Sequence, residues 1–159
     1  MEPATPERDE TPAERSDRHL HDLLGELRVG LPGVQVLFAF LLVVPFNARF
    51  DEVTPFQEKV YLATLVCTAL ASALLIAPSM QHRIEFRQGD KEHVVAVATR
   101  LTIAGLTLLA LGMIGVVVLV CDFLFGAATT IVVAGLIAAV FAWAWYITPI
   151  ARLRRIRRL

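Results

Sequence analysis

Charged side chains are scarce in this sequence. Only 19% of its 159 residues are Asp, Glu, Lys or Arg, whereas a typical soluble domain has about 25%. From Leu101 to Ala151, Asp122 is the only residue of these four types. Hydrophobic residues make up 56% of the chain, and apolar runs of about 20 residues are typical of membrane-spanning helices. The composition therefore argues against a soluble domain and indicates an integral membrane protein.

Cysteines and catalytic motifs are also scarce. Cys67 and Cys121 do not make a disulfide framework, and we expect both to be free thiols because they fall at different depths. The chain has no GxGxxG, GxxxxGK[ST], GxSxG or HExxH motif. Its four histidines lack metal-ligand spacing, so solvated surface positions are favoured over a metal site or pH switch: His19, His21, His82 and His93. We expect no enzymatic activity, cofactor or metal.

The first thirty residues are polar, with eight acids and four arginines. They do not resemble a secretory signal, which has a basic segment followed by an apolar one. Residues 1–11 are predicted to form a disordered tail. The T11-P-A-E14 segment then predicts a helix start, because Thr, Pro and Glu occupy capping positions. Leucines spaced three or four residues apart predict an amphipathic helix at about 12–30, lying at a membrane surface or against a partner helix.

Four membrane spans are predicted, at about 31–46, 59–77, 101–120 and 128–148. The first is ambiguous, since only twelve residues separate Pro32 from Pro45, and a helix of that length is too short to span. A spanning helix tolerates a proline kink, so Pro45 need not end it, and Pro32-Gly33 is interpreted as a joint with the preceding helix. The second span follows the start signal T54-P-F-Q57 and is predicted to continue past Pro78 to about Gln88, with a turn at Gly89 and a helix cap at Asp90.

The distribution of lysine and arginine tests the number of spans. With four spans, thirteen of these residues lie on the side of the termini and two lie on the other. With three spans, the N-terminal and C-terminal arginines would lie on opposite sides. Because positive residues concentrate on the cytoplasmic side, we expect four spans in a bacterial inner membrane, with both termini cytoplasmic.

Polar and small residues within the spans are the candidate functional positions. Gln35 interrupts the first span, where an interhelical hydrogen bond is favoured over a pore or ligand contact. Thr64, Thr68 and Ser72 recur every four residues in the second span. Helix packing is favoured for this hydroxyl stripe, and a water path is the alternative. Further small residues in the third and fourth spans predict tight packing, with some of them facing another subunit.

Two charged features remain. Asp122 stands near the C-terminal end of the third span, where a solvated acid is favoured over a buried functional one; if it is buried, Arg49 is its expected partner. The predicted cytoplasmic tail at 152–159 is basic and amphipathic, which indicates contact with anionic lipid headgroups. Nucleic-acid binding is not expected, because no aromatic residues interleave. The arginines assigned to lipid contact and topology are Arg152, Arg154, Arg155, Arg157 and Arg158.

Four segments carry a resemblance to a known family: ELRVGLPGVQVLFAFLLVVPF (26–46), FQEKVY (56–61), LLIAPSMQHRIEFRQGDK (74–91) and FAWAWYITP (141–149). Through them the chain resembles an uncharacterised family of small actinobacterial membrane proteins, classed as a domain of unknown function. The resemblance covers roughly residues 18–151. It implies a four-helix membrane protein, and it implies no catalytic residues.

The sequence thus predicts an all-α integral membrane four-helix bundle with an N-terminal amphipathic helix. We expect a non-enzymatic structural or accessory component of a membrane assembly, either as a homo-oligomer or with a membrane-protein partner. The alternative is a homo-oligomeric ion channel or small transporter with a polar path along Gln35, the hydroxyl stripe and Asp122.

Overall fold

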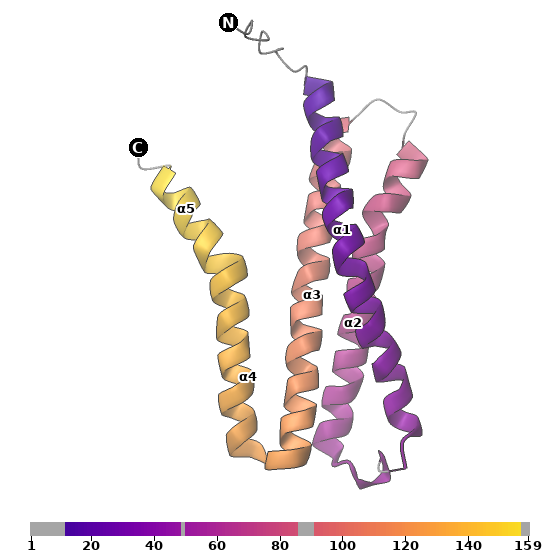
Figure 1. Cartoon of the computed structure of the whole chain (residues 1–159), viewed down its shortest axis with the longest axis vertical. Helices are drawn as coiled ribbons and strands as arrows, with labels where there is room; N and C mark the ends of the chain where they lie inside the picture. The colour runs from indigo at the N-terminus through magenta and orange to yellow at the C-terminus, as the bar shows by residue number, and fades with distance from the viewer. Residues whose placement is uncertain (1–11, 49, 86–90, 157–159) are drawn as a thin grey trace, which may run out of the picture.

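The computed structural model describes residues 12–48, 50–85 and 91–156, and every regular element in these ranges is helical. The predicted N-terminal tail, the Gly89 turn and the Asp90 cap lie outside the described residues. The elements shown in Figure 1 follow in the order α1 (Pro12–Val43), η1 (Val44–Phe46), η2 (Phe50–Glu52), α2 (Pro55–Glu85), α3 (Lys91–Phe125), α4 (Ala127–Ala142), η3 (Trp143–Ile147) and α5 (Thr148–Ile156). Elements η1 and η2 are 3-10 turns, and η3 is a π-helical turn.

Four stretches have the length and hydropathy of membrane spans: His21–Phe46, Pro55–Gln81, Val94–Phe125 and Ala127–Ala151. The predicted all-α, four-helix membrane architecture is therefore confirmed. The helices are longer than the predicted spans. Helix α3 has 35 residues and extends over roughly 50 Å, whereas the hydrocarbon core of a bilayer is about 30 Å thick. Some helical turns must therefore project beyond that core.

The helices are antiparallel, so the molecule has two distinct ends (Figure 1). We call the end where α1 begins and α5 finishes the terminal end. The opposite end, which carries the α1–α2 connection and the turn at Gly126 between α3 and α4, is the turn end. Gly126 has a φ of +81°, a conformation that L side chains rarely adopt, which explains why glycine forms this turn.

Helix α1 runs without interruption through Pro32, so the predicted joint at Pro32-Gly33 is absent. Proline removes one helical hydrogen bond, here to the carbonyl of Arg28, and a membrane helix can tolerate that loss. The predicted amphipathic helix is simply the first half of α1, and its apolar face packs inside the bundle. Leu23, Leu27 and Leu31 all join the core there.

The core lies where α1, α2 and α3 meet. Its buried members come from all three helices: Leu27, Val34, Ala71, Leu75 and Leu109. Pro78, which is fully buried, lies within α2 rather than closing it. The helix is described to Glu85, and the rest of its predicted course lies outside the described residues.

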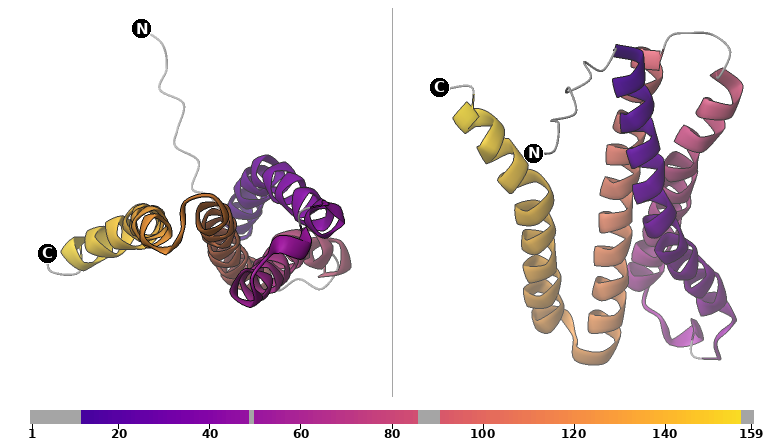
Figure 2. Two further views of the ribbon diagram at one scale, coloured as in Figure 1. Left: turned by 90° about the horizontal axis from the view of Figure 1, so that it is seen from below. Right: turned by 45° about the horizontal axis from the view of Figure 1, so that its top comes forward.

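Helix α4 stands apart from this three-helix core. Within the described part of the chain it contacts α3 but neither α1 nor α2, and α5 contacts only η3. Seen from below in Figure 2, α4 and α5 extend to one side of the group formed by α1, α2 and α3. Only Thr130 and Ala134 of α4 are buried, and both belong to its first half, near the turn end. The molecule is therefore a three-helix core with a fourth helix attached along one side.

Candidate functional site

The hydroxyl stripe of Thr64, Thr68 and Ser72 is bound to its own helix. Each side chain donates a hydrogen bond to the backbone carbonyl four residues earlier: Thr64 to Val60 at 2.7 Å, Thr68 to Thr64 at 2.8 Å and Ser72 to Thr68 at 3.0 Å. Thr64 and Thr68 are buried and Ser72 is half-buried. The hydroxyl protons are therefore already used within α2.

Glycines of α3 lie directly against this stripe. A Cβ added to Gly112 would lie 2.7 Å from the Oγ1 of Thr68, and a Cβ at Gly115 would overlap the side chain of Thr64. Contacts that close are possible only because glycine has no side chain. The stripe therefore belongs to the packed contact between α2 and α3, which leaves no room for a file of water along it.

Gln35 lies elsewhere, on the outer surface of α1. It is exposed near the middle of the His21–Phe46 span, and among the described residues its amide forms no hydrogen bond. The neighbouring positions Pro32 and Ala39 on the same side of the helix are also exposed. A side-chain amide in hydrocarbon is costly without a partner. Gln35 is therefore a polar group near the middle of a span that has no hydrogen-bond partner among the residues the structure describes.

Asp122 lies at the turn end, bound to a residue that was not a predicted site member. Its Oδ2 accepts a hydrogen bond of 2.9 Å from the Nε2 of Gln57, which is only 6% exposed. Asp122 is half-buried rather than fully solvated. Its predicted partner, Arg49, lies outside the described residues. The bond ties the last turn of α3 to the first turn of α2.

Gln57 also takes part in the N-terminal cap of α2. Its backbone N–H donates to the Thr54 hydroxyl at 3.3 Å, and the Thr54 N–H donates to its Oε1 at 3.0 Å. This is the reciprocal capping arrangement that the T54-P-F-Q57 motif predicts. The signal for Gln57 was thus visible in the sequence. A capping glutamine, unlike glutamate, has an amide N–H left over to donate to another helix.

A second cross-helix hydrogen bond holds the end of α1, which comes two residues before Pro45. Proline has no amide hydrogen, so the carbonyl of Leu41, four residues earlier, loses its helical partner. The Tyr61 hydroxyl of α2 donates to this carbonyl at 2.9 Å. The Tyr61 ring also meets Phe50 edge-on, with centroids 5.7 Å apart. Instead of a kinked continuation, α1 ends at Val43 and passes into η1, and Tyr61 holds that end against α2.

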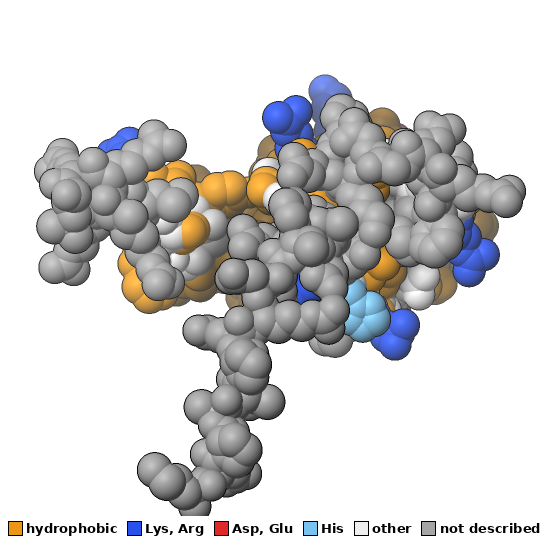
Figure 3. All heavy atoms as spheres, turned by 90° about the horizontal axis from the view of Figure 1, so that it is seen from above, with side chains coloured by type: hydrophobic (Ala, Val, Ile, Leu, Met, Phe, Trp, Pro, Cys, Tyr) orange, Lys and Arg blue, Asp and Glu red, His pale blue; other side chains and the backbone are white. Residues whose placement is uncertain are grey.

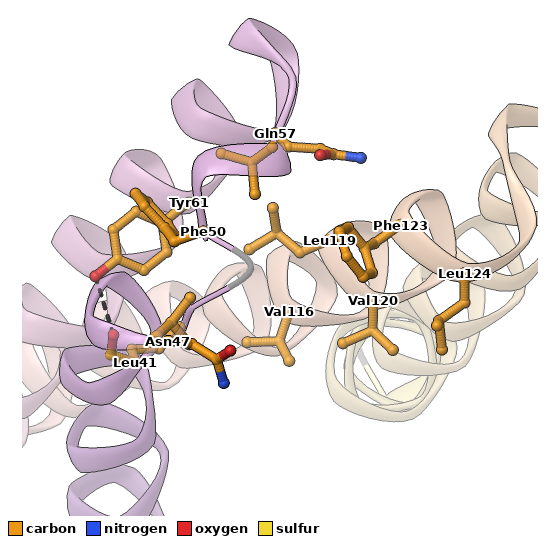
Figure 4. Close-up of a pocket in the computed structure, with 12 residues that line it drawn as sticks. Leu41, Asn47, Phe50, Gln57, Tyr61, Val116, Leu119, Val120, Phe123 and Leu124 are labelled. Carbon is orange, nitrogen blue, oxygen red and sulfur yellow. Dashed lines mark hydrogen bonds between the residues drawn. The ribbon is translucent and has the colours of Figure 1, made fainter.

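These two bonds flank a pocket at the turn end (Figure 4), which we call the turn-end pocket. It has a volume of about 410 Å³ and lies between α1, the α1–α2 connection, α2 and α3. Nine of its twelve lining residues are apolar: Leu41, Val44, Phe50, Val53, Val116, Leu119, Val120, Phe123 and Leu124. The other three are Asn47, Gln57 and Tyr61. None of the described lining residues carries a formal charge.

The aromatic segment Trp143–Ile147, which follows α4, is a π-helical turn. The Thr148 N–H bonds the carbonyl of Trp143, five residues back, and the Thr148 hydroxyl donates to the carbonyl of Ala144 at 2.8 Å. Pro149 follows and offers no N–H of its own. The Tyr146 hydroxyl forms a hydrogen bond with the hydroxyl of Thr107, which links this segment to α3.

The remaining candidate residues lie at the terminal end or form no cluster. Figure 3 looks onto the terminal end, where Lys and Arg side chains lie around its margin. Arg154 is exposed on α5, while Arg157 and Arg158 lie outside the described residues, as do the side chains of Arg152 and Arg155. Cys67 and Cys121 are half-buried free thiols. Within the described ranges, no group of three His, Cys, Asp or Glu residues could hold a metal ion.

Comparison with known proteins identifies a family whose function is unknown. A family model described as "Family of unknown function (DUF6328)" matches residues 9–149, so the chain belongs to this family. No curated protein and no solved structure matches the chain.

Proposed function

We propose that this member of a family of unknown function is a non-enzymatic subunit of a membrane assembly, with a structural or accessory role. Its partner is a second copy of the chain or another membrane protein. The observation that carries the proposal is Gln35, an exposed amide near the middle of a span without a hydrogen bond among the described residues. A neighbouring helix from another chain would supply the missing partner.

The shape of the molecule supports the same proposal. Among the described helices of the bundle, α3 alone packs along α4, and the small residues Gly135, Ala139 and Ala142 of α4 are exposed. Small residues let a second helix approach closely. The channel alternative has weaker support, because Thr64 and Thr68, which were to line its path, are buried in the α2–α3 contact.

The proposed location is the bacterial inner membrane, with the terminal end in the cytoplasm. The thirteen-to-two distribution of lysine and arginine between the two sides supports this orientation. The exposed arginine on α5 would then face anionic headgroups of the cytoplasmic leaflet. The turn end, with Asp122 and Gln57, would face the opposite side.

Replacement of Gln35 by leucine tests the proposal. An interhelical hydrogen bond within a membrane contributes about 0.6 to 1.7 kcal/mol, so Q35L should weaken association by about three- to twentyfold. The measurement is the mass of the protein and its co-purifying partners over a dilution series in mild detergent. The control is V36L, at the next exposed position of α1, which removes no polar group.

The wild-type chain should be recovered as an assembly larger than one chain, and V36L should behave as wild type. A wild-type protein that is a single chain at all concentrations would contradict the proposal, as would a Q35L variant that assembles normally. Ion flux through vesicles containing the purified protein would favour the channel instead.

A further inference from the structure

The turn-end pocket has no role in the proposed assembly, and its chemistry indicates what it holds. We propose that it binds one acyl chain of a phospholipid from the leaflet on the turn-end side. Its volume of about 410 Å³ lies within the range of about 300–1,000 Å³ typical of small-molecule sites. The inference concerns a different part of the surface from Gln35, so it stands or falls separately from the proposed function.

Two of the three polar residues that line the pocket are hydrogen-bonded within the protein through their side chains. Gln57 binds Thr54 and Asp122 through its side chain, and the Tyr61 hydroxyl donates to the carbonyl of Leu41. What these residues leave for a ligand is mainly hydrocarbon surface. Water is retained in a cavity where it finds two to four polar partners, whereas an apolar cavity stays dry. The turn-end pocket therefore suits a hydrocarbon chain better than water or a polar solute.

The pocket also opens where such chains are available. Val44, Val120 and Leu124 line it, yet they are 40%, 50% and 60% exposed, so its wall continues onto the outer surface of the helices. Its α3 wall runs from Val116 to Leu124, a length of about 12 Å along the helix. In Figure 4 these α3 side chains line one side of the pocket, and Asn47 and Phe50 lie on the other side. A chain can thus enter sideways between α1 and α3.

The walls are held in place independently of any ligand. The Gln57–Asp122 bond joins α2 to α3, and the Tyr61–Leu41 bond joins α2 to α1. The two bonds thus position α1 and α3 relative to α2 on either side of the pocket. An unfilled space of this kind forfeits van der Waals contacts along its lining, and an acyl chain restores them without any polar group being desolvated.

The test is native mass spectrometry of the full-length protein, purified in detergent and titrated with palmitoyl-oleoyl phosphatidylcholine. We expect one lipid to be retained per chain. Val120→Phe should lower retention at least about fivefold, which corresponds to a loss of roughly 1 kcal/mol, because its ring fills the pocket. The matched control is Val132→Phe on α4, where the original valine is 70% exposed and lines no part of the pocket.

A second blocking variant separates a blocked pocket from a misfolded protein as the cause of lower lipid retention. Val44→Phe narrows the pocket from the α1 side at an exposed position, so it should lower retention without loss of helical circular dichroism. A phosphatidylcholine with short acyl chains should be retained less than the long-chain lipid. Equal retention by wild type and both blocking variants would overturn the proposal, as would retention that is equally reduced in Val132→Phe or that does not depend on chain length.

Discussion

Helices α3 and α4 both carry glycines, and the surroundings of these glycines differ. On the α2 side, a Cβ at Gly112 would collide with Thr68, so glycine is required for the observed approach. On α4, Gly135 is exposed and has nothing within 4 Å of the position of its missing Cβ. Both helix pairs carry small residues in the sequence. Small residues therefore mark a tight contact only where the facing helix supplies a side chain that fills the space.

The largest expected effect comes from Gly112→Leu. The added side chain would have to displace Thr68, a β-branched residue whose hydroxyl is bound to its own helix, so little adjustment is available. Overpacking typically costs 1–3 kcal/mol and occasionally more, and we expect a loss of about 3 kcal/mol in the free energy of unfolding. Thermal unfolding in detergent, followed by circular dichroism, measures it.

Gly135→Leu is the matched control on α4, and its effect should be close to zero because its site is exposed. A double variant that adds Thr68→Ala to Gly112→Leu should recover part of the lost stability, since the two sites are in contact. Equal losses at Gly112 and Gly135 would show that the close approach of α2 does not set Gly112 apart from an exposed glycine.

A smaller effect is expected at the turn end, where the contact between α2 and α3 is polar. Asp122→Leu removes the acceptor of the Gln57 amide and leaves a nearly buried donor without a partner. Such a loss costs about 1–3 kcal/mol. Asp122→Asn should cost less, because its carbonyl oxygen can still accept from Gln57. The measurement is the shift in thermal unfolding, with Glu58→Leu, an exposed acid nearby, as the control.

A loss in Glu58→Leu as large as that in Asp122→Leu would mean that any acid at this end has the same effect. Asp122 would then have no special role in joining α3 to α2. If Asp122→Asn instead behaves as Asp122→Leu, the negative charge matters more than the hydrogen-bond acceptor.

The helices and their order could be predicted from the sequence, because apolar runs and lysine and arginine counts report directly on a membrane. The T54-P-F-Q57 cap was predictable for another reason. Its hydrogen bonds are local, because they join residues three positions apart. The second bond of Gln57 was not, because it joins residues 65 positions apart and depends on how α2 and α3 are aligned. The pocket was equally invisible, as it arises from the separation of α1 and α3 rather than from any one segment.

Prolines show the same division between local and tertiary effects. Pro32 was expected to form a joint and Pro45 a kink, yet α1 continues through Pro32 and ends before Pro45. Each proline frees one carbonyl, so the residue type alone does not distinguish them. Pro45 lies within η1, which follows α1, and Tyr61 from another helix donates to the free carbonyl of Leu41. The sequence could reveal the lost hydrogen bond but not its replacement.

The smallest expected effect tests the attachment of α4 at the terminal end. Thr107 donates its proton to the carbonyl of Ile103, so the Tyr146 hydroxyl is the donor in the bond between them. Tyr146→Phe removes that bond and should cost about 0.6 kcal/mol, the average for such contacts in a membrane. The clearer readout is hydrogen exchange, which should quicken in η3 and α5 while α2 is unchanged.

Tyr61→Phe is the matched control, because it removes the same hydroxyl from the three-helix core. There the Leu41 carbonyl would be left without a hydrogen-bond donor, because Pro45 has no N–H. The loss of stability should therefore exceed that of Tyr146→Phe. Exchange should then quicken near η1 rather than in α5. Faster exchange throughout α2 in Tyr146→Phe would show that α4 stabilises the core. Unchanged exchange in α2 would mean that the packing of α1, α2 and α3 does not depend on the bond between Tyr146 and Thr107.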